Sequence, residues 1–240
     1  MNRKIEVVQL VADSYPPYQY MDGDAVRGVD HDIIVAAFRE HGVDTITRLL
    51  PWGRCIQLLK EGKAHGIFQI VRTPEREKEY IFSKPLRAAK TVFYRRKEDP
   101  ITLRRDTGVW EQLRRFRVGV VKGYSYESPI DRLGEPFRVE MDSQTALLAG
   151  LTGGDFDLAI IDRGVAEYLA NKMGIDGIDT VEGYEMTRQL HVAFQRSRNE
   201  IADRFDSGLD RVKEKGIYDR IFEYYGLTQN RNINRGIHRS

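Results

Sequence analysis

The chain has 240 residues, with 38 basic and 36 acidic side chains and a formal net charge of +2. This length accommodates one large domain or two lobes with cores of their own, and the near balance of charge gives no reason to expect a nucleic acid as partner. No stretch approaches the roughly 20 apolar residues of a membrane-spanning helix, and a single cysteine, Cys55, excludes an internal disulfide and a cysteine-based metal cluster.

Cys55 and the N-terminus each support one further inference. Cys55 lies among apolar residues of a predicted helix, which favours a small buried side chain over a nucleophile. Met1-Asn2-Arg3-Lys4 runs directly into a strand pattern, which does not resemble a secretory signal peptide. The protein is therefore either cytoplasmic or secreted with its signal already removed, and the residues leave both open.

The first part of the chain alternates between strand and helix patterns. Residues 5 to 12 form a near-continuous apolar run, as expected for a buried parallel strand. A hairpin turn is predicted over residues 21 to 27, and Asp30 is predicted to cap the helix that follows. Further strands are predicted over residues 45 to 50 and 67 to 70, with a helix between them. This βαβαβ order predicts a parallel sheet with crossover helices.

A stiff aromatic loop follows the first predicted strand. The segment from Asp13 to Tyr20 contains paired prolines, which hold it extended, and three tyrosines. The three tyrosines, Tyr15, Tyr18 and Tyr20, either form a stacking wall for a ligand or only cap the edge of the core. The residues alone favour neither alternative.

The stretch from His65 to Pro85 is the first candidate for an anion site. An apolar strand ends there in Arg72-Thr73-Pro74-Glu75-Arg76, which places two arginines on a predicted turn. A guanidinium can hold a carboxylate or phosphate with two parallel hydrogen bonds, and open α/β sheets bind ligands at strand ends. The alternative is a solvated charged turn, in which surface ion pairs contribute little.

The second half repeats the alternation of strands and helices. After a strand over residues 91 to 96, the arginine-rich segment from Arg95 to Arg117 is predicted to be a solvated face. Residues 118 to 121 form a strand that leads into Gly123-Tyr124-Ser125, where backbone N–H groups can hold an anion. Asp162 follows a buried strand over residues 156 to 161 and either caps the next helix or binds a ligand.

The last part of the chain returns to the first half. A strand is predicted over residues 191 to 194, Asn199 is predicted to cap a helix, and a final helix covers residues 217 to 225. The pattern predicts three segments: residues 1–93 in lobe 1, residues 94–188 in lobe 2, and residues 189–240 completing lobe 1. A cleft between two lobes is a favoured place for a ligand.

Several blocks of the chain resemble the family 3 extracytoplasmic solute-binding proteins, the polar amino acid receptors of ABC importers. These blocks are Ala12 to Tyr20, Arg27 to Asp32, Leu58 to Phe82, Val118 to Gly123, Asp142 to Asp162 and Lys213 to Gly226. They span nearly the whole chain in family order. The resemblance implies a two-lobed α/β fold of the periplasmic binding protein-like type II, each lobe a mostly parallel sheet flanked by helices, with a ligand cleft between the lobes.

The resemblance also implies roles for particular residues. Arg76 matches the arginine that clamps an α-carboxylate, and Asp162 matches the acid that takes the α-ammonium. Ser125 lies in the loop that completes the carboxylate site. Aromatic or apolar positions that line the side-chain pocket are matched by Tyr15, Tyr18 and Trp52. A zwitterion needs one fixed cation and one fixed anion, which this set of residues provides.

Four residues depart from the family pattern. Val71 stands where members usually carry a small hydroxyl residue, and Tyr124 stands where they usually carry serine. Gln69 and Arg72 add polar groups that the average member lacks, and Arg72 favours a ligand with a second acidic group. These departures leave the identity of the ligand open.

The resemblance implies a binding protein, not an enzyme, that captures an amino acid or a similar small carboxylate-bearing solute. The lobes would close on it about a hinge, and the permease of an ABC importer would receive it. We expect a periplasmic monomer without cofactor or metal. Two alternatives remain: the sensing domain of a membrane receptor, and a cyclohexadienyl dehydratase-like enzyme with Glu75 or Asp162 as general acid.

Overall fold

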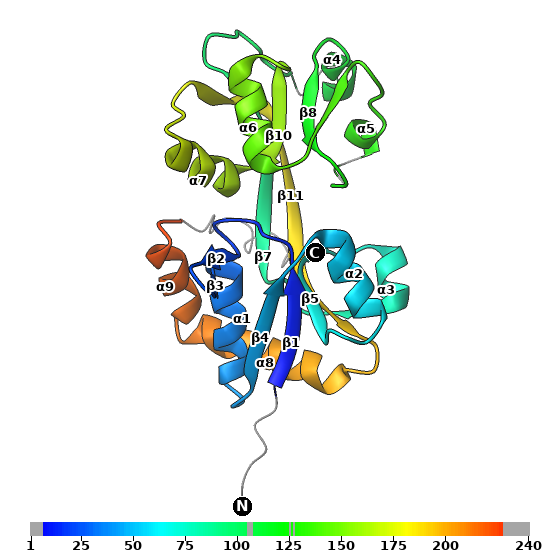
Figure 1. Cartoon of the computed structure of the whole chain (residues 1–240), viewed down its shortest axis with the longest axis vertical. Helices are drawn as coiled ribbons and strands as arrows, with labels where there is room; N and C mark the ends of the chain where they lie inside the picture. The colour runs from blue at the N-terminus through cyan, green and yellow to red at the C-terminus, as the bar shows by residue number, and fades with distance from the viewer. Residues whose placement is uncertain (1–6, 105–107, 125, 127, 228–240) are drawn as a thin grey trace, which may run out of the picture. The chain divides into compact units, whose positions relative to one another are not determined.

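The computed structural model describes residues 7–104, 108–124, 126 and 128–227, and the chain divides into two compact units. Unit 1 combines the chain up to Arg87 with the chain from Gln189 onward, and unit 2 is Ala88–Arg188. The chain passes between them twice, in strands β7 (Arg87–Arg96) and β11 (Ile178–Gln195) (Figure 1). The boundary predicted after residue 93 lies within β7.

Unit 1 is built on a sheet whose strands run in the order β4-β1-β5-β11. β1 pairs in parallel with both of its neighbours, which confirms the parallel sheet predicted from the βαβαβ order. β5 and the short β6 pair antiparallel with β11. The strands of this sheet that precede β11 are β1 (Val7–Ala12), β4 (Asp44–Leu49), β5 (Gly66–Val71) and β6 (Tyr80–Phe82).

Helices cover both sides of this sheet (Figure 1). They are α1 (Val29–Arg39), α2 (Trp52–Lys60), α3 (Pro74–Glu79), α8 (Asn199–Glu214) and α9 (Ile217–Tyr224). The predicted hairpin is also present, as antiparallel β2 (Tyr20–Asp22) and β3 (Ala25–Arg27).

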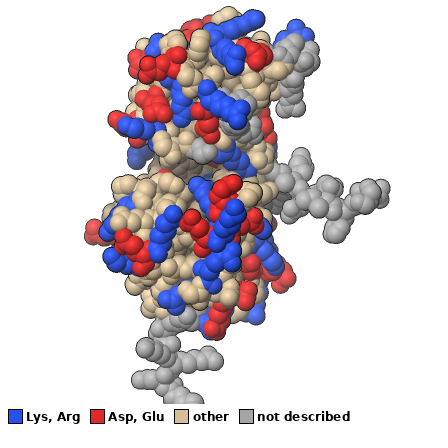
Figure 2. Space-filling model, turned by 90° about the vertical axis from the view of Figure 1, so that its right-hand side faces the viewer, with Lys and Arg blue, Asp and Glu red and all other residues tan. Residues whose placement is uncertain are grey.

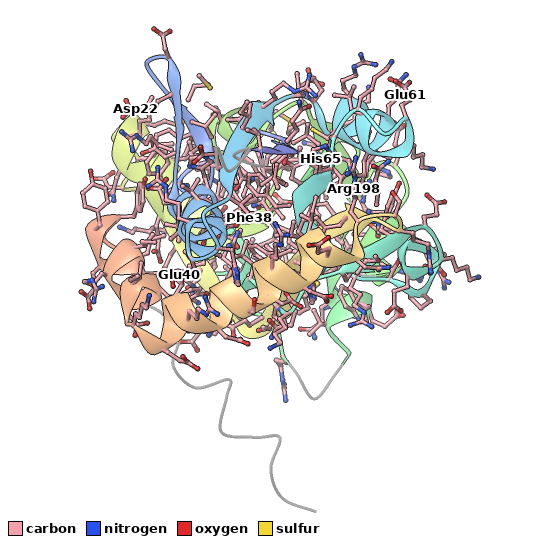
Figure 3. All side chains as sticks on the ribbon, turned by 90° about the horizontal axis from the view of Figure 1, so that it is seen from below. Asp22, Phe38, Glu40, Glu61, His65 and Arg198 are labelled. Atoms are coloured by element: carbon pink, nitrogen blue, oxygen red, sulfur yellow. The ribbon has the colours of Figure 1, made fainter. Side chains whose placement is uncertain are left out.

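The core of unit 1 joins its two chain segments. Phe38 of α1 contacts Phe205 of α8, with ring centroids 5.4 Å apart, and Phe194 of β11, with centroids 6.4 Å apart. All three rings are fully buried, and Figure 3 shows Phe38 beside α8. Two segments that lie far apart in the sequence therefore depend on each other for their apolar contacts.

In unit 2 the strand order is β7-β10-β8-β9, and β7 continues from β11 in one hydrogen-bonded sheet. β8 pairs in parallel with β9 and β10, whereas β7 is antiparallel to β10. Its strands are β8 (Val118–Val121), β9 (Arg138–Met141) and β10 (Leu158–Asp162), together with β7 and the first part of β11. Its helices are α4 (Val109–Leu113), α5 (Ser128–Asp131), α6 (Gln144–Gly153) and α7 (Arg163–Met173).

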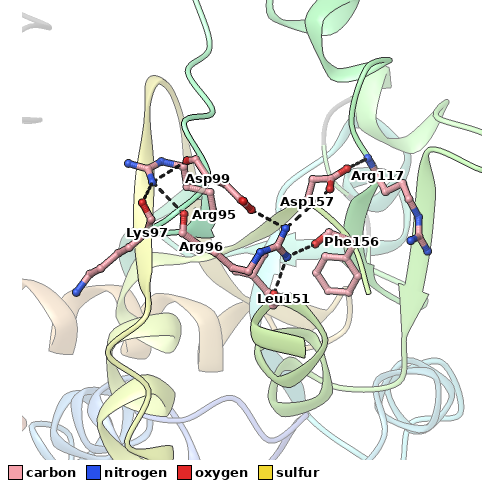
Figure 4. Close-up of polar contacts among 8 residues, drawn as sticks. All are labelled: Arg95, Arg96, Lys97, Asp99, Arg117, Leu151, Phe156 and Asp157. Carbon is pink, nitrogen blue, oxygen red and sulfur yellow. Dashed lines mark hydrogen bonds and ion pairs between the residues drawn. The ribbon is translucent and has the colours of Figure 1, made fainter. Parts of the chain in front are cut away.

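Two arginines of the segment predicted to be a solvated face are instead part of the scaffold of unit 2. The Arg96 guanidinium donates to the carbonyls of Leu151 and Phe156, at 2.9 and 2.7 Å, and pairs with Asp99 at 2.5 Å (Figure 4). Arg95 donates to three backbone carbonyls of its own turn. The Arg95 side chain is only 20% exposed, and the Arg96 side chain only 16%. Both arginines are held by hydrogen bonds to backbone carbonyls. The pattern of charges in the sequence does not show where such carbonyls will lie.

The structure corrects two predicted helix caps. Gly28, not Asp30, precedes α1, and a Cβ at Gly28 would lie 2.4 Å from the Tyr18 carbonyl oxygen. Asp30 lies one residue into α1 and is fully buried, because it pairs with an arginine described below. Arg198 rather than Asn199 precedes α8. The predicted cap at Ser143 is confirmed, since its Oγ accepts from the Ala146 N–H at 3.1 Å.

On the face shown in Figure 2, basic and acidic side chains lie interspersed. In the part of the chain that the structure describes, no helix combines the length and apolar character needed to cross a membrane. Cys55 is fully buried, which confirms the predicted core position, and burial raises the pKa of its thiol to about 11.

Candidate functional site

A stacked pair of tyrosines lies at the C-terminal end of β1. The loop is closed by the Tyr15 N–H, which donates to the Gln19 carbonyl at 2.8 Å, and by the Tyr18 N–H, which donates to the Tyr15 carbonyl at 2.9 Å. The two rings stack with centroids 6.1 Å apart and an interplanar angle of 20°. Tyr18 is buried, and Tyr15 is half-buried. Tyr15 is therefore the more accessible ring of the pair.

A buried ion pair lies beneath Tyr18. The Arg87 Nε donates to both carboxylate oxygens of Asp30, at 2.8 and 2.9 Å, and its guanidinium carbon lies 3.3 Å from the Tyr18 ring centroid. Arg87 and Asp30 are 5% and 0% exposed. The cation attracts the face of the ring and the carboxylate fixes the cation. Tyr18 thus contacts both Arg87, which begins β7, and Tyr15.

Two glutamines link this loop to the end of β5. Gln19 is fully buried, and its Nε2 donates to the Asp13 carbonyl and to Oε1 of Gln69. Gln69 has φ 61°, a left-handed conformation that is rare for residues other than glycine. It lies where the register between β5 and β11 shifts, opposite His191 and Val192. A strained residue at a bulge is typical of functional sites.

Arg76 lies just beyond this bulge. The predicted turn is a short helix, α3, in which Thr73 is the N-cap and Pro74 the first residue. Arg76 Nη1 donates to the Val71 carbonyl at 2.8 Å, and burial lowers the pKa of Arg76 from its usual value. In the described residues no carboxylate forms an ion pair with Arg76, so its remaining N–H groups can receive an anion.

Arg72 and Trp52 take different positions. Arg72 is exposed and forms an ion pair with Glu77, its Nε donating to Oε1 at 2.5 Å. Trp52 begins α2 and packs against a buried apolar cluster that includes Cys55 and Ile70. Of the two predicted arginines, Arg76 alone lacks a carboxylate partner within the described part of the chain.

Unit 2 contributes the remaining predicted positions. Asp162 ends β10, and its Oδ1 accepts from the Val165 N–H at 3.2 Å, which confirms that it caps α7. Its side chain is buried. The Tyr124 N–H donates to the Val121 carbonyl at 3.2 Å, and the half-buried Tyr124 follows Gly123, which has φ 78°. Ser125 lies outside the described residues.

In unit 1 these residues offer groups that can bind a ligand. They are the half-buried guanidinium of Arg76, the half-buried ring of Tyr15, the buried carboxamide of Gln19 and the half-buried carboxamide of Gln69. Glu75, a candidate general acid, is exposed, and hydrogen bonds from its own backbone N–H and from Thr73 lower the pKa of its carboxyl. A carboxyl with a lowered pKa is ionised near neutral pH and is a poor proton donor.

Comparison with known proteins identifies the family. Over residues 7–228 the chain matches the bacterial extracellular solute-binding proteins, family 3. The chain belongs to this family. The predicted resemblance is confirmed, since the match spans both units and includes all of the described residues.

Curated relatives of this family 3 solute-binding protein are named for basic amino acids. The arginine-binding extracellular protein ArtP of Bacillus subtilis (strain 168) is 22% identical over 223 residues, covering 91% of this chain and 85% of that protein. The putative ABC transporter arginine-binding protein 2 of Escherichia coli (strain K12) is 25% identical over 215 residues, covering 87% and 86%. A probable histidine-binding protein of Campylobacter jejuni is 24% identical over 224 residues, covering 90% and 83%.

Solved structures confirm the fold. A histidine kinase sensor domain similar to periplasmic binding proteins has a TM-score of 0.82 at 20% identity, covering 94% of this chain and 99% of that one. The arginine-, lysine-, histidine-binding protein ArtJ of Geobacillus stearothermophilus has a TM-score of 0.79 at 19% identity, covering 94% and 97%. At these identities the likeness establishes the periplasmic binding protein-like α/β fold, as predicted, and not the ligand.

The solute-binding protein gathers some predicted residues and separates others. In unit 1, Tyr15 stacks on Tyr18, and Val71 accepts a hydrogen bond from Arg76. Gln69 joins the tyrosine loop through Gln19, whereas Arg72 is directed to Glu77. Asp162 and Tyr124 belong to unit 2.

Three residues of this site were not predicted from the sequence: Gln19, Asp30 and Arg87. Asp30 was assigned only as a cap, and Arg87 lies 57 positions away from it. The only sequence signal for Gln19 is that it is a polar residue between two tyrosines, Tyr18 and Tyr20. The pairing of Asp30 with Arg87 has no local sequence signature.

Proposed function

We propose that this solute-binding protein captures an amino acid, or a similar small solute with a carboxylate, and delivers it to an ABC importer in the periplasm. One observation carries the proposal. Arg76 is a half-buried cation that bonds a backbone carbonyl on one side and pairs with no carboxylate of the described residues. Such a guanidinium is suited to hold an incoming carboxylate with two hydrogen bonds.

The remaining contacts follow from the chemistry of a zwitterion. Asp162 of unit 2 receives the ammonium; a carboxylate has about four acceptor directions, so its helix-capping bond is compatible with this contact. Tyr15 supplies an aromatic face for the side chain, with Tyr18 and the Arg87–Asp30 pair supporting it. The names of the arginine- and histidine-binding relatives favour a basic amino acid, whose cation an aromatic face attracts.

Capture then requires contacts from both units. Because the chain passes between the units in β7 and β11, these strands are the proposed hinge. A ligand stabilises a closed form only through contacts that the open form lacks. Small-angle scattering tests this step: the radius of gyration should fall when a confirmed ligand is added, and an unchanged radius would contradict closure.

The capture step is tested by thermal unfolding with a ligand panel. The panel contains arginine, histidine, glutamine, small di-acids and polyamines, and the variants are Arg76→Met and, as a matched control, Arg54→Met. Arg54 is exposed on α2 and donates to Gln57. A ligand at 100 times its dissociation constant should stabilise the wild type by about 2.7 kcal/mol. The stabilisation should vanish in Arg76→Met and persist in Arg54→Met, and its survival in Arg76→Met would overturn the proposal.

A sensing domain remains the second candidate, because the histidine kinase sensor domain shares this fold. Both functions need the same capture step, so the two differ in what receives the closed form. Stimulation of transport by a reconstituted importer supports the first function. A gene that continues past Ser240 into a membrane-spanning helix supports the second.

A further inference from the structure

The outer edge of the unit 1 sheet is formed by β4. β4 lies at the end of the strand order and pairs with β1, and no other described strand pairs with it. The Leu50 N–H donates to the Ala12 carbonyl beside β4. The backbone N–H and C=O groups of successive residues point to alternate sides of a strand. Those of Ile46 and Arg48 therefore point toward β1, and those of Thr45 and Thr47 point away from it. β4 thus offers a row of backbone donors and acceptors to another strand.

A hollow lies beside the first residues of this edge. The hollow, of about 700 Å³, lies next to Asp44, Thr45 and Ile46. Its other wall is formed by α1 and α9, with Val35, Ala36, Arg39 and Ile221 among the lining residues. Arg27 of β3 and His31 and Asp32 of α1 also line the hollow, which therefore combines apolar with charged side chains.

Apolar side chains are exposed at the same edge. Ile46 is 52% exposed and Val7 is 39% exposed, and they are two of the few large hydrophobic side chains exposed to this degree among the described residues. In the parallel register Val7 pairs with Asp44, and Gln9 pairs with Ile46. Val7, Ile46 and Asp44 therefore lie on one face of the sheet.

The sequence of β4 is complementary to itself. Asp44 and Arg48 lie two residues before and two residues after Ile46, on the same face of the strand. If two copies of β4 pair antiparallel about Ile46, each Asp44 lies opposite the partner subunit's Arg48, and the two Ile46 side chains meet at the axis. Thr45 and the partner subunit's Thr47 then exchange backbone hydrogen bonds. Edge strands that resist pairing usually carry charges that repel a second copy. In this edge strand, the opposite charges of Asp44 and Arg48 instead attract a second copy.

We propose that the β4 edge is an interface with a second copy of this chain, paired antiparallel about a two-fold axis at Ile46. Such an interface is isologous, so each contact occurs twice. The Arg48 Nη2 donates to the Lys63 carbonyl at 3.2 Å, which leaves its other N–H groups for the carboxylate. A five-residue pairing is smaller than the roughly 800 Å² per partner of a standard interface, so the dimer is weak and forms at high protein concentration. This proposal replaces the expectation of a monomer and does not depend on the ligand.

Charge exchange across the axis provides the test. Sedimentation velocity over a concentration series is measured for the wild type, Asp44→Arg, Arg48→Asp, and the double variant Asp44→Arg/Arg48→Asp. Each single variant should weaken association by about tenfold, because two opposite-charge pairs become two like-charge pairs. The double variant restores both opposite-charge pairs and should associate like the wild type. Asp22→Arg, on the exposed hairpin, is the matched control and should leave association unchanged.

Two further results decide the proposal. Ile46→Lys should abolish association, since it places two ammonium groups at the axis, while the circular dichroism of the variant should match the wild type. A wild type that stays monomeric over the whole series overturns the proposal. A dimer that persists in Ile46→Lys, or that the double variant fails to restore, also overturns it.

Discussion

At the scale of single residues, the Arg87–Asp30 pair is the most constrained feature of the site. Both side chains are buried, and the guanidinium is held between the Asp30 carboxylate and the Tyr18 ring. Removing one charge from a buried pair leaves the other uncompensated, which costs more than removing both. The pair is therefore a case in which a double substitution should be milder than a single one.

We expect Arg87→Met to lower the free energy of unfolding by about 3–5 kcal/mol, because Asp30 is left charged and buried. The double variant Arg87→Met/Asp30→Leu should recover part of this loss. Urea unfolding monitored by circular dichroism measures both values. A double variant less stable than Arg87→Met would contradict the uncompensated-charge explanation.

Residue-level prediction from the sequence succeeded where chemistry is local. Asp162 was expected either to cap α7 or to bind a ligand, and the cap is confirmed by the Val165 N–H. The left-handed conformation of Gln69 could not be predicted, because it depends on the register shift against β11. The contact of Gln69 with Gln19 joins residues 50 positions apart, for which local patterns carry no signal.

At the scale of elements, α1 and α8 approach closely at one glycine. A Cβ at Gly208 of α8 would lie 2.1 Å from the Ala37 carbonyl oxygen of α1, which is backbone and cannot rotate away. The end of α1 is also tied to α8: Ser207 Oγ lies 2.8 Å from His41 Nε2, and Lys215 Nζ pairs with Glu40 at 2.6 Å. Close contact of the two helices thus requires glycine at this position.

We expect Gly208→Ala to destabilise the protein by roughly 1–3 kcal/mol, because α8 must move off α1 to make room. Gly53→Ala in α2 is the matched control, since no atom lies within 4 Å of its Cβ position. Alanine favours a helix over glycine, so Gly53→Ala should be neutral or stabilising by up to about 1 kcal/mol. Thermal unfolding of both variants distinguishes steric contact from helix propensity; equal effects would contradict the steric explanation.

Elements with strong periodicity were predicted well, and those that depend on tertiary contacts were not. β9 was predicted at its observed bounds, Arg138–Met141. β11 begins at Ile178, whereas a strand was predicted only from residue 191. The polar residues between these positions obscure the alternation, so the length of β11 depends on pairing with its neighbours.

At the scale of the whole molecule, a buried histidine should make stability depend on pH. His191 of β11 is buried, its Nδ1 lies 2.8 Å from the Ser83 carbonyl, and its ring meets Phe82 edge-on. Burial lowers the pKa of His191 below 6.5, with a further contribution from the charge of Arg72 and an opposing one from the Ser83 carbonyl. Burial also lowers the pKa of His41, helped by Arg211. In both cases the folded protein holds the neutral form more strongly than the unfolded chain does.

The unfolded chain therefore binds more protons below pH 6.5, and stability should fall as the pH drops through 6.5 toward the lower folded pKa. Above pH 6.5 the neutral histidines make their full contribution to stability. Urea unfolding at a series of pH values should show this slope, and His191→Gln should reduce it while His41 retains its share. An unchanged slope in His191→Gln would contradict the assignment.

The order of the chain has a consequence for biosynthesis. Unit 2 is one continuous segment, whereas the core of unit 1 needs Phe194 and Phe205, which follow unit 2 in the sequence. A ribosome makes unit 2 complete while Phe38 of α1 still lacks both partners. Unit 2 can therefore fold first. The apolar face of α1 stays uncovered while the ribosome synthesises unit 2. That interval is when the nascent chain is most exposed to aggregation and when a chaperone would act.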